Sequence, residues 1–340
     1  MSATATPAFD LASGPPLPLP RGPLSEAVLG AIMRCRADVR LPAVDPADPL
    51  ADDDLHLALY ACYELHYRGF AGVHAEWEWD PGLIAARAEL ERTFERALRA
   101  AVDAPSATPD ELERTLRALV ADDDGPPLSR FLQREATLDQ FREFMIHRSA
   151  YQLKEADPHS WAVPRLAGRA KEALVEVQAD EYGGGRPGRM HATLFGASMR
   201  AVGLEDTYGA YLDRLPGTTL ATVNLMSLFG LHRRLRGCIV GHLAAFEMTS
   251  PGPNRRYATG LRRLGAEDAT EFFDEHVEAD AVHEAVAAHD LAAGLARQEP
   301  ALADDILFGA AALLRLEAGF AEALLDAWAD GGTALRDESV

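Results

Sequence analysis

Cysteine is scarce in this sequence, and the few cysteines present exclude two classes of site. Only Cys35, Cys62 and Cys238 occur among 340 residues, far apart and without a Cys-x-x-Cys pair. This pattern predicts neither a disulfide framework nor a zinc site, and it is typical of proteins in a reducing compartment. The chain also lacks a basic-then-apolar signal and any apolar run near the ~20 residues of a membrane helix. We therefore expect a cytoplasmic protein that does not enter a membrane.

Positive charge is also in short supply. The chain has 33 basic and 53 acidic side chains, which gives a formal net charge of −20 and a pI of about 4.9. Nucleic acids and anionic membrane surfaces bind basic faces, so we expect neither as a partner. No phosphate-binding loop or dinucleotide fingerprint occurs in the sequence. The charge says nothing positive about a partner, and a small-molecule substrate is implied only by the resemblance given below.

Strand-forming residues are sparse, whereas Ala and Leu dominate a composition that is 48% hydrophobic. This composition predicts an all-α fold. Residues 1–24 hold many prolines and predict a disordered leader, and residues 25–122 predict an N-terminal helical region. The run Asp122–Pro127 predicts a linker, and residues 128–332 predict a bundle of about seven core helices. The expected helices span residues 26–37, 55–69, 82–102, 108–122, 128–135, 137–156, 165–182, 190–202, 206–214, 219–234, 235–248, 257–264, 269–289 and 301–330.

The expected helix over residues 269–289 carries three polar side chains on the face that should be apolar and turned toward the core. Residues spaced by three and four positions share one face of a helix. A carboxylate buried on such a face costs several kcal/mol, about 3–5, unless something compensates its charge. Two imidazoles and a carboxylate form a set suited to a transition metal, although a solvated face or hydrogen-bonded core histidines would give the same pattern. The stripe consists of Phe273, His276, Asp280, His283 and Ala287.

Acidic residues also lie on the apolar faces of three other expected helices. They are Glu155, Glu181 and Glu247, and a metal site in a helical bundle draws its ligands from several helices. Glu247 is the clearest of them, because its segment holds no other acid. Glu155 could be an ordinary acid at a helix end, and Glu181 has Asp180 and Glu176 as competing neighbours.

A glycine-rich segment follows Glu181 directly. Tyr182–Gly188 contains four glycines and a proline, which cannot continue a helix, so the chain must break there. Such a break allows His191, at the start of the next helix, to turn back toward Glu181. Alternatively, this segment is a simple loop between two helices without a functional role.

In order and spacing, these residues resemble the heme-oxygenase-like diiron oxidases and oxygenases, over roughly residues 130–330. The resemblance implies a heme-oxygenase-like helical bundle that holds two iron ions and uses O2 as a co-substrate. The preceding helical arm is similar to a region that some members use for dimerisation, so a homodimer is implied. The resemblance implies seven metal ligands: Glu155, Glu181, His191, Glu247, His276, Asp280 and His283.

The ten-residue step from Glu181 to His191 is similar to the N-oxygenase branch of that family. That branch oxidises an amine or guanidine of an amino-acid-derived molecule in secondary metabolism, with an external reductant as a further partner. A diiron oxidase that decarboxylates, cleaves or desaturates a fatty or amino acid is an alternative within the same fold. A non-catalytic helical protein that binds heme or another cofactor is an alternative of a different class. Four arginines are candidates for a substrate carboxylate, and the sequence singles out none of them: Arg148, Arg165, Arg186 and Arg189.

Overall fold

The computed structural model describes residues 14–34 and 39–337, and the side chains of residues 278–282 lie outside this description. The described residues form helices and connecting loops without a β-strand, which confirms the all-α prediction. Cys35 lies outside the description, and the other two cysteines are buried as free thiols. The α-helices are α1 (Pro23–Arg34), α2 (Asp53–Glu64), α3 (Pro81–Ala101), α4 (Leu112–Ala121), α5 (Leu128–Arg134), α6 (Leu138–Gln152), α7 (Asp157–Ser160), α8 (Gly168–Glu181), α9 (His191–Ala201), α10 (Gly217–Leu231), α11 (Arg236–Thr249), α12 (Pro251–Arg263), α13 (Glu271–Ala285), α14 (Ala293–Gln298) and α15 (Ala303–Ala329).

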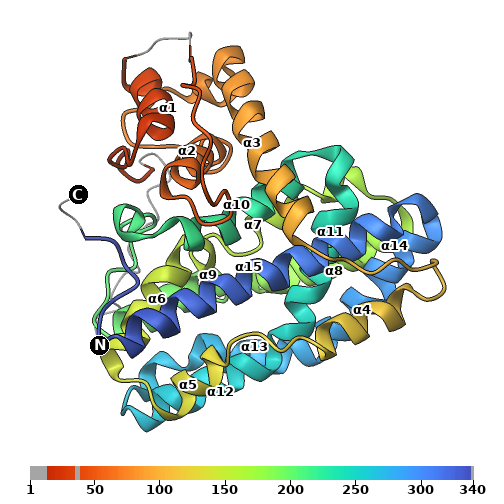
Figure 1. Cartoon of the computed structure of the whole chain (residues 1–340). Coiled ribbons are helices and arrows are strands. Elements are labelled where there is room, and N and C mark those ends of the chain that lie inside the picture. The colour runs from red at the N-terminus through yellow and green to blue at the C-terminus, as the bar shows by residue number, and fades with distance from the viewer. Residues whose placement is uncertain (1–13, 35–38, 338–340) are drawn as a thin grey trace.

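The long helix α15 crosses the middle of the molecule and packs along α11 (Figure 1). Their backbones approach closely at two glycines. A Cβ atom added at Gly241 would lie 1.8 Å from the carbonyl oxygen of Ile306, and one added at Gly309 would lie 2.0 Å from that of Cys238. Only glycine permits this approach, which fixes the central helix pair on which the bundle is built.

The N-terminal helices α1 to α3 lie together on one side of the bundle, at the upper left of Figure 1. Helix α2 packs on α10, and one hydrophobic core contains residues such as Leu59 of α2 and Leu225 of α10. Pro15 and Pro18 of the expected leader are buried, while residues 1–13 lie outside the described residues. The division at residues 122–127 into two units stays a prediction.

Several expected helix ends were wrong. The helix over 137–156 stops at Gln152, and a turn follows. The helix expected at 257–264 begins at Pro251, because the fixed φ of proline suits the first turn of a helix. Residues 206–214 contain only the short 3-10 turn Leu212–Arg214. Helix α13 continues as a π-helical turn over Val286–Ala292, a deformation that is common at functional sites.

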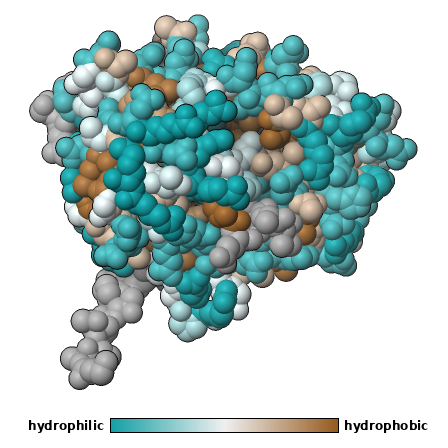
Figure 2. All heavy atoms as spheres, turned by 90° about the horizontal axis from the view of Figure 1, so that it is seen from below, coloured by the Kyte–Doolittle hydropathy of each residue, from teal (hydrophilic) through white to brown (hydrophobic). Residues whose placement is uncertain are grey.

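The face of the molecule seen from below in Figure 1 is mostly hydrophilic, with hydrophobic residues only in small areas (Figure 2). This surface agrees with the large negative charge of the chain. Among the described residues, no helix has both the length and the apolar character needed to cross a membrane.

Candidate metal centre

Glu155 lies in the turn that follows α6, and the backbone of this turn is unusual. Ala156 has φ +73°, a left-handed conformation that costs a residue with a Cβ of order 1 kcal/mol. Two contacts hold the turn in place. The Gln178 amide donates a hydrogen bond to the Ala156 carbonyl at 2.8 Å, and buried Lys154 pairs with Glu64 of α2 at 2.9 Å. The surroundings therefore fix the position from which the Glu155 carboxylate enters the core.

Glu181 is the last residue of α8, and the chain returns from it to His191 through a glycine turn. Gly183, Gly184 and Gly185 all have positive φ, between 58° and 72°. A Cβ atom at Gly183 would lie 2.5 Å from the Arg189 carbonyl carbon, so a side chain at this position would push the return segment away. As a result, Nδ1 of His191 lies 2.7 Å from Oε2 of Glu181, as the sequence led us to expect.

The ring of His276 on α13 has a fixed orientation, in which Nε2 faces Glu155. A backbone carbonyl only accepts hydrogen bonds, so the contact of 2.8 Å between Nδ1 and the Phe272 carbonyl requires the proton on Nδ1. In the neutral ring the lone pair is then on Nε2, and this atom lies 3.4 Å from Oε1 of Glu155. Ligand atoms from four buried residues converge within 4.8 Å of one another: Glu155, Glu181, His191 and His276.

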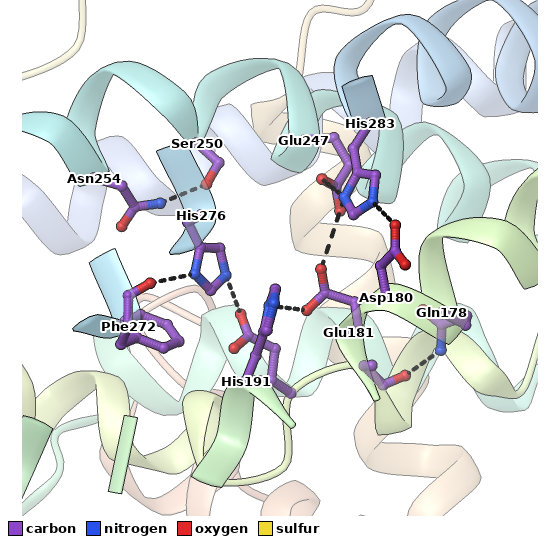
Figure 3. A network of polar contacts seen from close by, with 12 residues as sticks. Gln178, Asp180, Glu181, His191, Glu247, Ser250, Asn254, Phe272, His276 and His283 are labelled. Carbon is purple, nitrogen blue, oxygen red and sulfur yellow. Dashed lines mark hydrogen bonds and ion pairs between the residues drawn. The ribbon is translucent and has the colours of Figure 1, made fainter. Parts of the chain in front are cut away.

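His283 belongs to a second cluster, two turns further along α13 (Figure 3). Its Nε2 hydrogen-bonds to Asp180 at 3.0 Å. Its Nδ1 lies 3.4 Å from Oε2 of Glu247 and 3.9 Å from Oε1 of Glu181. Glu181, Glu247 and His283 thus form a second group of ligand atoms within 4.8 Å, and Glu181 is common to both clusters.

The two clusters gather carboxyl groups that are buried away from water. Glu155, Glu181 and Glu247 are 4%, 7% and 4% exposed, so water cannot stabilise their charges. Burial raises the pKa of Glu155 and of Glu247. Within the described part of the chain, neither of these two carboxylates forms an ion pair with Lys or Arg. One oxygen of Glu155 is also buried without a hydrogen-bond partner among the described residues.

The neighbouring carboxyl groups also change the pKa of His283. Burial by itself lowers its pKa, but Glu247, Asp180 and Glu181 outweigh this effect and raise the pKa to about 9. Imidazole nitrogens and carboxylate oxygens together suit iron, manganese or zinc, and a shared carboxylate can bridge two ions. The donor set therefore fits a two-metal centre.

The structure brings together six of the seven residues that the resemblance implied as ligands. Asp280 is the seventh, and its side chain lies outside the described residues. His276 and His283, which the sequence could not assign to one ion or two, belong to different clusters. Sequence reasoning treated Asp180 as a competitor of Glu181, whereas the structure gives both residues a role at one histidine. The pairing of Lys154 with Glu64 was not expected, and no spacing signal pointed to it.

A cavity of about 790 Å³ connects the first cluster with the surface. Glu155 and His276 are buried in its lining, whereas all the exposed lining residues fall within residues 123–130, so we call this segment its outer end. Its walls combine aromatic rings, such as Phe144 and Phe246, with several polar side chains. A site of this size and mixed character is typical for a small organic molecule.

Comparisons with known proteins relate the chain to a family of iron enzymes. Residues 142–318, more than half of the chain, match the family described as iron-containing redox enzymes. A nitrosourea synthase from Streptomyces achromogenes subsp. streptozoticus is 30% identical over 132 residues, which are 38% of this chain and 28% of that enzyme. The match therefore spans little more than a quarter of the length of this relative.

The fold itself is similar to that of a solved structure. A CADD-like protein of unknown function from Nostoc punctiforme superposes with a TM-score of 0.51 at 17% sequence identity. The superposition covers 63% of this chain and 95% of the other. This likeness supports the heme-oxygenase-like helical fold that the sequence led us to expect.

Proposed function

Because this chain belongs to the iron-containing redox enzyme family, we propose that it is an O2-activating non-heme diiron oxidoreductase. The observation that carries the proposal is Glu181, whose two oxygens face different ligand clusters. Oε2 lies against His191 of the first cluster, and Oε1 faces His283 of the second. One buried carboxylate between two clusters is what a pair of neighbouring metal ions needs. When bound, the irons would supply the electrons and the Lewis acidity for O2 chemistry.

The protein contributes the orientation of its ligands and the access to them. The Phe272 carbonyl directs Nε2 of His276 toward the first cluster, and Asp180 directs Nδ1 of His283 toward the second. Such outer contacts fix the tautomer and the rotation of a ligating imidazole. The cavity reaches the first cluster at Glu155 and His276, so we assign substrate approach to that side.

For the reaction, we propose N-oxygenation of an amine or guanidine in an amino-acid-derived molecule. The matched nitrosourea synthase carries the name of a product with an oxidised nitrogen, and it supports this choice. In such a reaction an N–H becomes N–OH, and the second atom of O2 leaves as water. This balance consumes two electrons and two protons, so an external reductant belongs to the proposal. We further propose a cytoplasmic homodimer that acts in secondary metabolism.

The test begins with metal content. We expect the purified protein to bind about two Fe(II) per chain under anaerobic conditions. Admission of O2 should then produce a transient visible absorption. His276→Ala should lower the iron content and abolish this transient. Failure to take up iron, or an undiminished transient in His276→Ala, would refute the proposal.

The type of reaction is decided by mass spectrometry of amine and amino-acid substrates after exposure to O2. N-oxygenation adds ~16 mass units to the substrate nitrogen. Loss of CO2 or of two hydrogens would instead favour the alternative of an oxidase that decarboxylates or desaturates. A non-catalytic heme protein would bind heme and leave the buried carboxylates without a role.

A further inference from the structure

The cavity that leads to the first cluster has a distinct charge pattern. Three arginines line it: Arg130 on α5 is exposed, whereas Arg148 on α6 and Arg256 on α12 are half-buried. Arg148 forms a bidentate ion pair with Glu317 of α15, with distances of 2.8 and 2.6 Å. Its guanidinium also lies 4.4 Å from the ring centroid of Phe320. The charge of Arg148 is therefore already balanced within the wall.

The other arginines that the sequence brought forward have partners elsewhere. Arg165 donates to the carbonyls of Gly230 and Leu231, and Arg189 pairs with Glu271 and Glu275. Arg186 donates to the Gly183 carbonyl at 3.1 Å, and none of these three arginines lines the cavity. Since they lie outside the cavity, we do not assign them to the substrate.

Arg256 differs from Arg148 in having a neutral partner, and from Arg165 in lining the cavity. Its guanidinium donates to the hydroxyl of Ser129 on α5 at 3.1 Å, and among the described residues it forms no ion pair with a carboxylate. A guanidinium has five N–H donors in a planar fork, which matches the two oxygens of a carboxylate. A half-buried cation with one neutral partner keeps donors available to an incoming anion.

The position of Arg256 along the cavity can be read from its neighbours. Ser250 and Asn254, at the start of α12, lie beside His276 at the metal end (Figure 3). Arg256 contacts Ser129, which belongs to the segment that lines the outer end. The start of α12 thus presents neutral polar groups near the first cluster and a cation toward the outer end of the cavity.

We propose that Arg256 binds the carboxylate of the substrate and thereby directs the opposite end of the molecule toward Glu155 and His276. This inference rests on the proposed function, and it adds the recognition of an amino acid by its carboxylate. Exposed Asp123 and Asp124 at the outer end are compatible with a substrate that also carries a cationic nitrogen. Arg256 acts here as a specificity-determining residue.

The experiment compares amino acids with amines that differ from them only by loss of the carboxylate. Binding of L-arginine and agmatine, and of L-lysine and cadaverine, is measured by calorimetry on the Fe(II)-loaded protein without O2. At least one amino acid should bind tenfold or more tightly than its amine. Arg256→Ala should weaken amino-acid binding by about 10- to 100-fold, as expected for loss of a charged hydrogen-bonded contact, and leave amine binding unchanged.

The neighbouring arginine provides a matched control. Arg255 is exposed and does not line the cavity, so Arg255→Ala should bind both kinds of probe like the wild type. Arg256→Lys should retain part of the preference for the carboxylate. Iron content and circular dichroism should be unchanged in all three variants, which separates recognition from folding.

Two results would overturn the inference. One is that Arg256→Ala binds every amino acid tested as tightly as the wild type does. The other is an Arg256→Ala variant that loses amino acid and amine equally. Oxygen transfer is measured separately, so the outcomes remain distinguishable. Binding of an amino acid through Arg256 without any oxidation of it would refute the proposed function alone. Oxidation of an amino acid that is equally efficient in Arg256→Ala and in the wild type would refute this inference alone.

Discussion

Asp180 hydrogen-bonds to Nε2 of His283 at 3.0 Å, while the opposite nitrogen of the ring faces Glu247 and Glu181. Asp180 is the residue before Glu181, at the end of α8. Two successive residues therefore act on one histidine. Glu181 lies on the Nδ1 side of the ring, together with Glu247, and Asp180 hydrogen-bonds to the opposite nitrogen, Nε2. A carboxylate behind a ligating imidazole makes the imidazole a better metal ligand.

Asp180→Asn should weaken metal binding in the second cluster and leave the first cluster nearly unchanged. An amide keeps the size of the side chain but loses the negative charge that supports His283. Loss of such an outer contact costs about 10- to 100-fold in metal affinity. Anaerobic titration with Fe(II) in competition with a chelator would measure two affinities, of which one should fall. Glu176→Gln, a neighbouring exposed acid on α8, is the matched control and should change neither.

Glu181→Gln should affect both metal ions, whereas Glu155→Gln or Glu247→Gln should affect only one. The reason is that Glu181 contributes to both clusters, and each of the other two contributes to one. Iron content after anaerobic loading should fall to well below one per chain in Glu181→Gln and remain near one in the other two variants. Equal losses in all three variants would contradict the division into two clusters.

The free energy of unfolding should decrease in mild acid because of the buried residue His56. Burial lowers its pKa from 6.5 to about 4. The unfolded chain therefore binds more protons than the folded protein between these pH values, and stability falls as the pH decreases from 6.5 to 4. This one residue can account for at most about 3 kcal/mol over that range. Urea unfolding at a series of pH values would measure the slope.

His56→Gln supplies the comparison for this slope. In the folded protein Nε2 of His56 contacts the Pro49 carbonyl at 3.0 Å, and Asn224 donates to Nδ1 at 3.2 Å, so the neutral ring is satisfied. Glutamine does not titrate, and the variant should show a shallower loss of stability below pH 6.5. Parallel curves for the variant and the wild type would show that other groups, such as buried His242, carry the acid sensitivity.

Spacing along helices predicted much of the fold and of the site, because helical periodicity is a local property. His276 and His283 were identified from their places on one stripe of α13, and the glycine break correctly brought His191 to Glu181. Glu155 was identified on a wrong premise, since α6 ends before it and a left-handed turn presents it instead.

Contacts between distant segments could not be read from the sequence. The pairing of Lys154 with Glu64 spans 90 residues, and that of Asp180 with His283 spans 103. No periodic pattern links residues so far apart, and only packing of the helices brings them together. Arg256 was missed for the same reason, because its importance follows from the cavity it lines.

Gly241→Ala and Gly309→Ala should each destabilise the protein by at least about 1–3 kcal/mol, the usual cost of overpacking a core. At both positions the added methyl group would meet a backbone carbonyl of the opposite helix, at 1.8 and 2.0 Å, and a backbone cannot rotate away like a flexible side chain. Helices α11 and α15 would have to separate, and Glu247 of α11 would move with them. We therefore expect a lower midpoint of thermal unfolding and weaker metal binding in the second cluster.

Gly319→Ala is the control within the same helix. An added Cβ there would meet only the guanidinium of Arg315, at an ordinary 3.5 Å. Alanine is more favourable than glycine inside a helix by about 0.8–1 kcal/mol, so this variant should be slightly more stable than the wild type. The midpoint of thermal unfolding should fall in Gly241→Ala and Gly309→Ala and rise slightly in Gly319→Ala. If all three rose together, the close approach of α11 and α15 would not be a constraint on the fold.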